Sequence, residues 1–247
     1  MKIITDKNEA LIAVRQDGFA LRYVSEEFRA DREIVLTAVK QFGLALEFAS
    51  EELKADREIV LTAVKQFGWA LKWASEELQR DKEVVLEAVK QDGFALEYAS
   101  KELQADKEVV LTAAKQHGYA ALKFANDELK NDKGVVLTAV EQNGYALEHV
   151  SEEFRVDKEV VLTAVKKHGM ALKWASDELR NDKKVVLEAV KQDGLALKYV
   201  SYELRNDSEV VLTAIKTTNG WALQFASPEL KNEIRQKIQD NSIIYLK

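Results

Sequence analysis

The chain has 247 residues, of which 47% are hydrophobic and 32% are charged, so it is too apolar and too regularly patterned for a disordered protein. Its formal net charge of -6 disfavours a bulk electrostatic attraction to nucleic acid or to an anionic membrane. The absence of cysteine excludes a disulfide framework and a thiolate metal site, and no apolar run approaches the ~18 residues that a membrane span needs. The first residues also lack the apolar stretch of a signal peptide, which together with the lack of cysteine favours an intracellular location.

A unit of about 25 residues recurs nine times along the chain and indicates a repeat protein. The units begin with an aspartate at residues 6, 31, 56, 81, 106, 132, 157, 182 and 207. The units that start at Asp31 and Asp56 differ at only five positions, whereas two others are one residue longer, at Ala120-Ala121 and at 217–219. We therefore expect a single repeat domain over residues 1–247, with a C-terminal capping segment at 233–247.

The first part of each unit predicts a long helix, as residues 81–93 illustrate. Asp81 is a favourable N-cap, and Glu83 lies in the first turn, where the helix dipole favours negative charge. The apolar positions within 84–89 cover an arc of roughly 200°, wider than the ~100° stripe of a surface helix, which predicts neighbouring helices on both sides. We expect Gly93 to end the helix as the left-handed residue that follows the C-cap.

The rest of the unit predicts two shorter helical pieces. After Gly93, Leu96 is expected to face inward and Glu97 outward. In the last unit the matching serine is Ser227, and it is followed by Pro228. Proline is favoured at the first position of a helix but costs about 3 kcal/mol inside one. The repeated serine is therefore predicted to be the N-cap of a separate brief turn, so that each unit contains a long helix, a short helix and a helical turn.

Stacking of the units is required because a single unit cannot bury both faces of its helices. We expect an all-α fold, an α-solenoid of nine helix-turn-helix repeats that forms a curved superhelical rod. Asn8-Glu9 should give the first repeat a polar outer face. The tail is expected to cover the last open face with its apolar residues, which are Ile234, Ile238, Ile243, Ile244 and Leu246.

The ordered strings of the unit resemble the repeats known as domain of unknown function 4116. These strings read Asp-Lys-Glu-Val-Val-Leu-Glu-Ala-Val-Lys-Gln, Gly-x-Ala-Leu-x-Tyr-Ala-Ser and Glu-Leu-Arg-Asn-Asp. The resemblance covers residues 6 to 232, with mild departures at Gly134, where Glu is usual, and at His149, where an aromatic residue is usual. It implies tandem helical repeats and no activity, so it assigns a functional role to no residue.

The candidates for chemistry have simple structural interpretations. His117, His149 and His168 lie in different units without a cysteine nearby, which favours turn or packed residues over metal ligands. A glutamate recurs two residues after the serine-type cap in all nine units, which favours a structural duty over acid–base work. No nucleophile–base pairing is legible, so we expect no enzyme, no cofactor and no metal site.

Two sets of charges recur down the array. The residue between the leucine and the aromatic residue of the second helix alternates in sign over seven units, and we expect a ladder of ion pairs that specifies the register. This column reads Arg22, Glu47, Lys72, Glu97, Lys123, Glu148, Lys173, Lys198 and Gln224. Basic columns could track a phosphate backbone, but a solvated face with dipole complementarity is the favoured interpretation. One column is the Lys or Arg that follows most capping aspartates, and the other reads Arg15, Lys40, Lys65, Lys90, Lys115, Glu141, Lys166, Lys191 and Lys216.

The residues on either side of the turn glycine vary most between units. Positions that hold a repeat fold recur, whereas positions that are free or functional vary, and exposed aromatic residues can anchor a partner. The candidate partner-binding residues are Phe42, Phe67, Asp92, His117, Asn143, His168, Asp193, Trp69, Tyr119 and Tyr145. The alternative interpretation is packing at the edge of the core for the residue after the glycine and neutral drift for the residue before it.

These patterns lead to a functional hypothesis and an alternative to it. The favoured hypothesis is a monomeric, non-catalytic protein–protein interaction scaffold that binds an unknown protein or peptide and no membrane. The alternative is a nucleic-acid-binding helical repeat protein that uses one unit per base, because varied residue pairs flank each glycine. The acidic balance of the chain disfavours this alternative.

Overall fold

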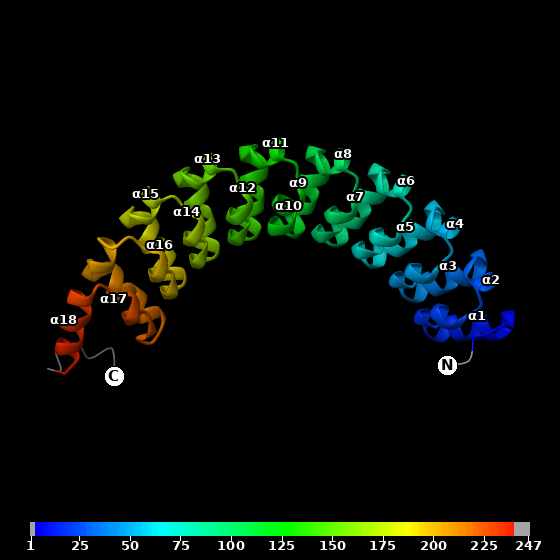
Figure 1. The fold of residues 1–247 in the computed structure, drawn as a ribbon, viewed down its shortest axis with the longest axis horizontal. Helices are drawn as coiled ribbons and strands as arrows, with labels where there is room; N and C mark the ends of the chain where they lie inside the picture. Colours follow the sequence, from blue (N-terminus) through cyan, green and yellow to red (C-terminus); the bar gives the residue numbers. More distant parts are fainter. Residues whose placement is uncertain (1–2, 240–247) are drawn as a thin grey trace. The chain divides into compact units, whose positions relative to one another are not determined.

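The structure, a computed structural model, describes residues 3–239 apart from the side chain of residue 238, and it confirms an all-α repeat fold. The chain divides into two compact units, residues 1–129 and residues 130–247. In each unit, successive repeats stack side by side as a helical solenoid (Figure 1). Within the described residues, extended pairing is limited to an isolated bridge between Ile4 and Val24. No helix in this part of the chain is long and apolar enough to cross a membrane.

Every repeat begins with an α-helix of ten residues. These long helices are α1 (Lys7–Gln16), α3 (Arg32–Gln41), α5 (Arg57–Gln66), α7 (Lys82–Gln91), α9 (Lys107–Gln116), α12 (Lys133–Gln142), α14 (Lys158–Lys167), α16 (Lys183–Gln192) and α17 (Ser208–Thr217). The predicted aspartate N-caps are confirmed, and Asp81 accepts hydrogen bonds from the N–H groups of Glu83 (2.9 Å) and Val84 (3.1 Å). Of the apolar residues in α7, Val84, Val85, Ala88 and Val89 are fully buried and Leu86 is half-buried, because each long helix packs against the next one within its unit.

The second element of a repeat is usually a 3-10 helix. These elements are η1 (Gly18–Tyr23), η2 (Gly43–Phe48), η3 (Gly68–Trp73), η4 (Gly93–Tyr98), α10 (Gly118–Phe124), η5 (Gly144–His149), η6 (Gly169–Trp174), η7 (Gly194–Tyr199) and η9 (Trp221–Phe225). In η4, Leu96 is buried and Glu97 is exposed, as predicted. The extra residue at Ala120-Ala121 lengthens the segment to seven residues, and this segment is the α-helix α10.

The third element lies on the opposite side of the long helices from the 3-10 helices (Figure 1), and it is short in every repeat except the last, where α18 has 12 residues. These elements are α2 (Glu26–Arg29), α4 (Glu51–Lys54), α6 (Glu76–Gln79), α8 (Lys101–Gln104), α11 (Asp127–Lys130), α13 (Glu152–Arg155), α15 (Asp177–Arg180), η8 (Leu204–Asn206) and α18 (Pro228–Gln239). Helix α18 begins at Pro228, so the sequence argument for a separate turn is confirmed. The serine caps most of these elements, and Ser100 Oγ accepts from the Leu103 N–H group, although Ser25 and Ser151 make no such bond.

The glycine between the first two elements is required by close packing between repeats. The left-handed backbone predicted for Gly93 is wrong. Among residues 3–239, the one glycine with a positive φ is Gly220, at 91°. A Cβ atom on Gly93 would lie 2.6 Å from the carbonyl oxygen of Ala113 and 3.0 Å from Cβ of His117, both in the next repeat. Helix α7 ends instead at Asp92, whose backbone is extended. The glycine therefore lets the backbones of two repeats approach each other.

Ion pairs join successive repeats through the cation that follows the capping aspartate. Lys82 Nζ lies 2.7 Å from Asp106 Oδ2 and 2.8 Å from Glu108 Oε2 in the next repeat. The equivalent pairs are Lys7–Asp31, Arg32–Asp56, Arg57–Asp81, Lys133–Asp157, Lys158–Asp182 and Lys183–Asp207. Exposed pairs contribute only about 0.2–1 kcal/mol each, so their main effect is to specify which residues of adjacent repeats face each other.

The ladder of ion pairs predicted for the column from Arg22 to Gln224 is wrong. Within the described part of the chain, none of these charges pairs with its neighbour in the column. Several of the cations lie instead over the aromatic ring of the next residue, and Lys72 Nζ is 5.5 Å from the centroid of the Trp73 ring. The contact to an adjacent ring is local, whereas an ion pair along the column would have to reach across a full repeat.

Acid is expected to destabilise the fold through the capping aspartates. Partial burial alone would raise the pKa of Asp81, but hydrogen bonds from Arg57 and from the Val84 N–H group lower this pKa below its ordinary value of 3.8. The pKa is also lowered at the other paired caps, Asp31, Asp56, Asp106, Asp157, Asp182 and Asp207. A carboxyl group with a lower pKa in the folded chain adds stability above its unfolded pKa, and this stability is lost as the pH falls through the folded value.

We therefore expect the thermal midpoint to stay level from pH 7 to about 5 and to fall progressively below about pH 4. Melts followed by circular dichroism at low salt measure this dependence. Asp81→Asn keeps a capping side chain but cannot titrate, so its midpoint should fall less steeply than that of the wild type. A loss of stability that is already complete between pH 7 and pH 5 would contradict this account.

The last residue of the short helix satisfies the carbonyl groups at the end of the preceding 3-10 helix. Gln104 is only 5% exposed, and its Nε2 atom donates to the carbonyl oxygens of Leu96 (3.0 Å), Glu97 (3.2 Å) and Ala99 (3.2 Å). In the first repeat, Arg29 makes the equivalent bond to a carbonyl oxygen at 2.7 Å. This position varies among Arg, Lys and Gln because each of these side chains can donate to a carbonyl oxygen.

Gln104→Leu is expected to destabilise the chain by about 1–3 kcal/mol, because buried carbonyl groups would lose their donor. Gln104→Arg should have a much smaller effect, because arginine occupies this position in other repeats. Urea unfolding of the two variants measures the difference. Equal destabilisation by leucine and arginine would show that packing, rather than hydrogen bonding, determines the residue here.

The two ends of the described chain differ from the middle repeats. Glu9 is exposed, although the equivalent Ile34 of the second repeat is fully buried, so the predicted polar face of the first repeat is confirmed. In α18, Ile234 is 3% exposed. The side chain of Ile238, and residues Ile243, Ile244 and Leu246, lie outside the described residues, so the role predicted for them stays a prediction.

Candidate partner-binding surface

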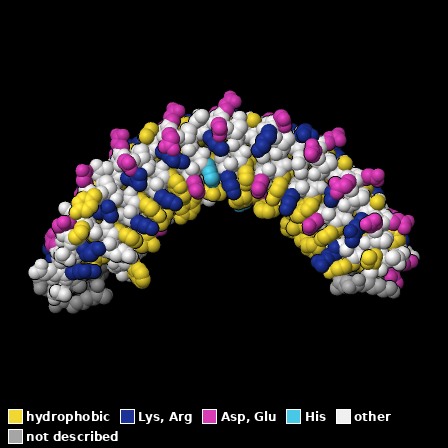
Figure 2. Space-filling view, viewed as in Figure 1, with side chains coloured by type: hydrophobic (Ala, Val, Ile, Leu, Met, Phe, Trp, Pro, Cys, Tyr) yellow, Lys and Arg dark blue, Asp and Glu magenta, His cyan; other side chains and the backbone are white. Residues whose placement is uncertain are grey.

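A row of aromatic side chains follows the 3-10 helices of the first unit. This aromatic row consists of Phe19, Phe42, Phe67, Trp69, Phe94 and His117. The Phe42 ring lies between its neighbours, with centroid distances of 4.6 Å to Phe19 and 5.0 Å to Phe67. Figure 2 shows hydrophobic side chains gathered along this edge of the unit, whereas Asp and Glu side chains gather along the edge of the short helices.

The exposed large hydrophobic members of the aromatic row lie in the third repeat. Phe67 is 39% exposed and Trp69 is 42% exposed, although both are large hydrophobic residues. Phe42 is half-buried beneath its neighbours, and His117 is exposed at the end of α9. Burying Phe67 and Trp69 against a partner would therefore remove apolar surface that the fold itself leaves in contact with water.

Polar candidates next to the turn glycine have a structural duty. Asp92 Oδ1 accepts a hydrogen bond from the Phe94 N–H group at 2.9 Å, which caps η4. Asn143 and Asp193 cap η5 and η7 in the same way, with bonds of 3.0 and 2.9 Å. Phe42 and Phe67 stand at this position without a capping bond, so their presence there is not explained by the local backbone.

The remaining candidates pack against their neighbours. His168 is half-buried, its Nδ1 accepts from the Gly144 N–H group at 3.0 Å, and the Tyr145 ring stacks on it with centroids 4.5 Å apart. Burial, together with the charge of Lys167, lowers the pKa of His168, which agrees with a neutral ring that accepts a hydrogen bond. Tyr119 is half-buried on α10. The structure thus brings together the first-unit aromatic candidates, and Tyr145 and His168 form a smaller cluster in the second unit.

A depression of about 250 Å³ opens beside Trp69 in the first unit. Its lining includes the aromatic rings of Phe67, Trp69 and Trp73 and the carboxylate of Asp92. Trp73 was not among the sequence candidates. Its place four residues after Trp69, on the same short helix, could have indicated that the two rings lie near each other. The bond from Trp69 Nε1 to Asp92 Oδ2, at 2.7 Å, joins two repeats and could not be read from the spacing.

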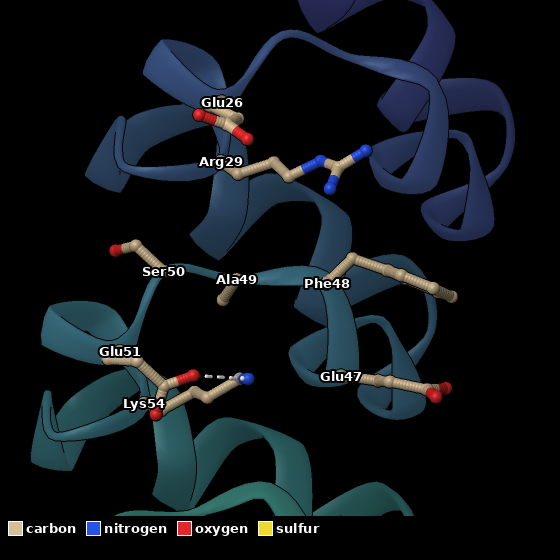
Figure 3. Close-up of a pocket in the computed structure, with 8 residues that line it drawn as sticks. All are labelled: Glu26, Arg29, Glu47, Phe48, Ala49, Ser50, Glu51 and Lys54. Atoms are coloured by element: carbon tan, nitrogen blue, oxygen red, sulfur yellow. Dashed lines mark hydrogen bonds and ion pairs between the residues drawn. The ribbon is translucent and has the colours of Figure 1, made fainter.

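A larger groove of about 420 Å³ lies between α2 and α4, near the short-helix edge, and it is polar (Figure 3). Its cations are already engaged, because Lys54 pairs with Glu51 at 2.8 Å and Arg29 donates to the Arg22 carbonyl oxygen at 2.7 Å. Such a groove is typical of a solvated charged face. It therefore provides no anchor comparable to the exposed rings on the other edge.

Charged side chains of the described residues contact neighbouring groups of the fold. No group of three or more His, Asp or Glu side chains among residues 3–239 is placed to hold a metal ion. The pKa of Glu102 is lowered chiefly by a hydrogen bond from Ser100, the N-cap of α8, in agreement with the structural duty expected for this glutamate column. The cations after the capping aspartates are paired with the next repeat, so this column is already neutralised within the protein.

The architecture is that of a tandem helical repeat protein, and a family comparison agrees with it. The family model described as Domain of unknown function (DUF4116) matches residues 6–54, 56–104, 106–155, 157–205 and 183–231. Because these matches span most of the chain, it belongs to this family, and each match covers two of the 25-residue repeats. No curated protein and no solved structure matches the chain.

Proposed function

We propose that this chain is a non-catalytic scaffold that binds a protein or peptide partner along the aromatic row of its first unit. The observation that carries this proposal is the exposure of Phe67 (39%) and Trp69 (42%) beside an open depression. Large aromatic residues are enriched in the energetically important centres of protein interfaces. A row of aromatic residues spanning several repeats offers a partner an extended strip of such residues.

The absence of a catalytic role is part of the same proposal. The histidines lie in different repeats, and His168 uses its Nδ1 atom to accept a backbone hydrogen bond. His117 lies beside Asp92, with 3.3 Å between Nδ1 and Oδ1, but Asp92 already caps η4. These contacts give each group a structural function that needs no substrate.

Nucleic acid is a weaker candidate for the partner. The cations that follow the capping aspartates form ion pairs with acidic residues of the next repeat, so binding a phosphate at this column would require these pairs to be broken. In the first unit, hydrophobic side chains gather along one edge and acidic side chains along the other (Figure 2). The acidic balance of the chain and the enrichment of aromatic residues in protein interfaces favour a protein partner.

The proposal is tested by affinity capture from a lysate of the source cells, with and without nuclease treatment. The expected result is a specific set of proteins that survives nuclease and that binds the purified chain directly in a second, two-component experiment. If the captured proteins disappear after nuclease and the chain binds oligonucleotides at low salt, the nucleic-acid alternative replaces the proposal.

A further inference from the structure

The depression beside Trp69 combines aromatic walls with one carboxylate. Phe67, Trp69 and Trp73 supply the rings, and Asp92 supplies the charge from the following repeat. Trp69 and Asp92 are joined by the 2.7 Å bond from Nε1 to Oδ2. The carboxylate is therefore held against the edge of an exposed indole ring.

The walls of this depression are held in place before any ligand arrives. The Trp69 ring packs edge-on against Tyr98, with centroids 5.9 Å apart, and Phe67 contacts Phe42 at 5.0 Å. Because these contacts and the bond to Asp92 already order the rings, a ligand would lose little binding free energy in ordering them.

Two donor side chains of the lining are already engaged, and Gln91 and Asp92 supply its other polar side chains. The indole N–H of Trp69 is used by Asp92. The Gln66 side chain is also engaged, because Oε1 accepts from the Gly43 N–H group at 3.0 Å and Nε2 donates to the Val39 carbonyl oxygen at 2.9 Å. An ionised carboxylate has about four lone-pair sites, so Asp92 can accept from a ligand in addition to its contacts with Trp69, Phe94 and His117.

We propose that this depression binds a lysine or arginine side chain of the protein partner, an inference that rests on the function proposed above. The faces of tryptophan and phenylalanine attract cations, and the Lys72 ammonium already lies 5.5 Å from the centroid of the Trp73 ring. The aliphatic stem of the ligand side chain packs against the apolar walls while its head group pairs with Asp92.

A proline-rich segment is the alternative occupant of an aromatic groove. The backbone carbonyl groups of such a segment are unpaired and need donors in the groove. Here the indole donor of Trp69 is already bound to Asp92, and the carboxylate would face those carbonyl oxygens. The lining therefore favours a cationic donor over a row of carbonyl acceptors.

Peptide titrations followed by NMR test the inference on the full chain. The indole N–H signals of Trp69 and Trp73 are assigned with single Trp→Phe variants, and four peptides are added, Gly-Gly-X-Gly-Gly with blocked ends, where X is lysine, arginine, norleucine or proline. We expect lysine and arginine peptides to shift both signals and to bind at least about 5-fold more tightly than the norleucine peptide. Equal binding of the norleucine or proline peptide would overturn the inference.

Two matched variants separate binding from folding. Asp92→Asn retains a capping side chain, since Asn143 caps the equivalent helix, and it should weaken lysine-peptide binding about 3–10-fold. Asp17→Asn is the control, because Asp17 makes the same capping bond to the Phe19 N–H group (2.9 Å). Asp17 does not line the depression, so this variant should leave peptide binding unchanged. An unchanged affinity of Asp92→Asn would overturn the role of the carboxylate.

The inference and the proposed function can fail separately. One result would overturn the cation site alone. In that case partner binding is lost on changing Phe67, but it is unchanged by Asp92→Asn and by replacement of the partner's lysine and arginine residues with glutamine. Lysine peptides that bind at Trp69 while no protein partner depends on the aromatic row would instead overturn the proposed function.

Discussion

Gly93→Ala is expected to destabilise the chain by about 3 kcal/mol, at the upper end of the usual range for overpacking. The new Cβ atom would lie 2.6 Å from the Ala113 carbonyl oxygen and 3.1 Å from the His117 backbone nitrogen. Both obstacles are backbone atoms at the C-terminal part of α9, so they cannot move without separating two repeats. A urea unfolding curve, with hydrogen exchange to show that α7 and α9 are the helices loosened, measures the effect.

Two other glycines serve as controls for Gly93. Gly134 is exposed in the first turn of α12, where other repeats have a residue with a Cβ atom, so Gly134→Ala should stabilise the chain by about 0.5–1 kcal/mol through helix propensity. Gly220 has a φ of 91° and no atom near its Cβ position, so alanine there should be disfavoured by backbone strain alone, by about 1 kcal/mol. If Gly93→Ala were no more destabilising than Gly220→Ala, close packing would not be the reason for the repeated glycine.

The double variant Phe42→Ser, Phe67→Ser is expected to weaken binding of the captured partner at least about 30-fold, which corresponds to about 2 kcal/mol. The physical reason is the loss of two rings in contact with each other, one of them 39% exposed, from the proposed surface. Isothermal titration with the purified partner measures the affinity, and circular dichroism verifies that the helices remain folded.

Val156→Ser is the matched control for this double variant. Val156 is also a large exposed hydrophobic residue, at 56%, but it ends the short helix α13 on the opposite side of the long helices. Removing it should leave partner binding unchanged. If Val156→Ser weakened binding and the phenylalanine variant did not, the surface would have to be assigned to the short helices.

Local signals were enough to predict the elements of each repeat. The capping aspartates mark the start of every long helix, and the proline at residue 228 reveals the separate short element in all the other units. These signals act within a few residues, so they can be read from one unit. The 3-10 form of the second element was not predicted, because a segment of six residues is too short for its periodicity to distinguish it from an α-helix.

Contacts between repeats were predicted less well. Gly93 has the sequence context of a helix C-cap, but its reason lies 20 residues away, at Ala113. Similarly, Lys82 pairs with Asp106, and the alternating column that suggested a ladder instead places its cations over adjacent rings. Such contacts depend on the distance and angle between stacked helices, which the repeat period alone does not specify.

The candidate site was predicted in part. Sequence variation around the turn glycine identified Phe42, Phe67 and Trp69, which the structure places in one row. It also selected Asp92, Asn143 and Asp193, whose variation is compatible with a capping duty because Asp and Asn cap equally well. Variation alone cannot separate these two causes, whereas hydrogen-bond geometry can.

Hydrogen exchange of the full chain with and without its purified partner tests the central claim most directly. The account predicts added protection in η2, η3 and η4, the 3-10 helices that carry or adjoin Phe42, Phe67 and Trp69, and no change in α4, α6 and α8 on the other edge. Protection confined to α4, α6 and α8 would contradict it.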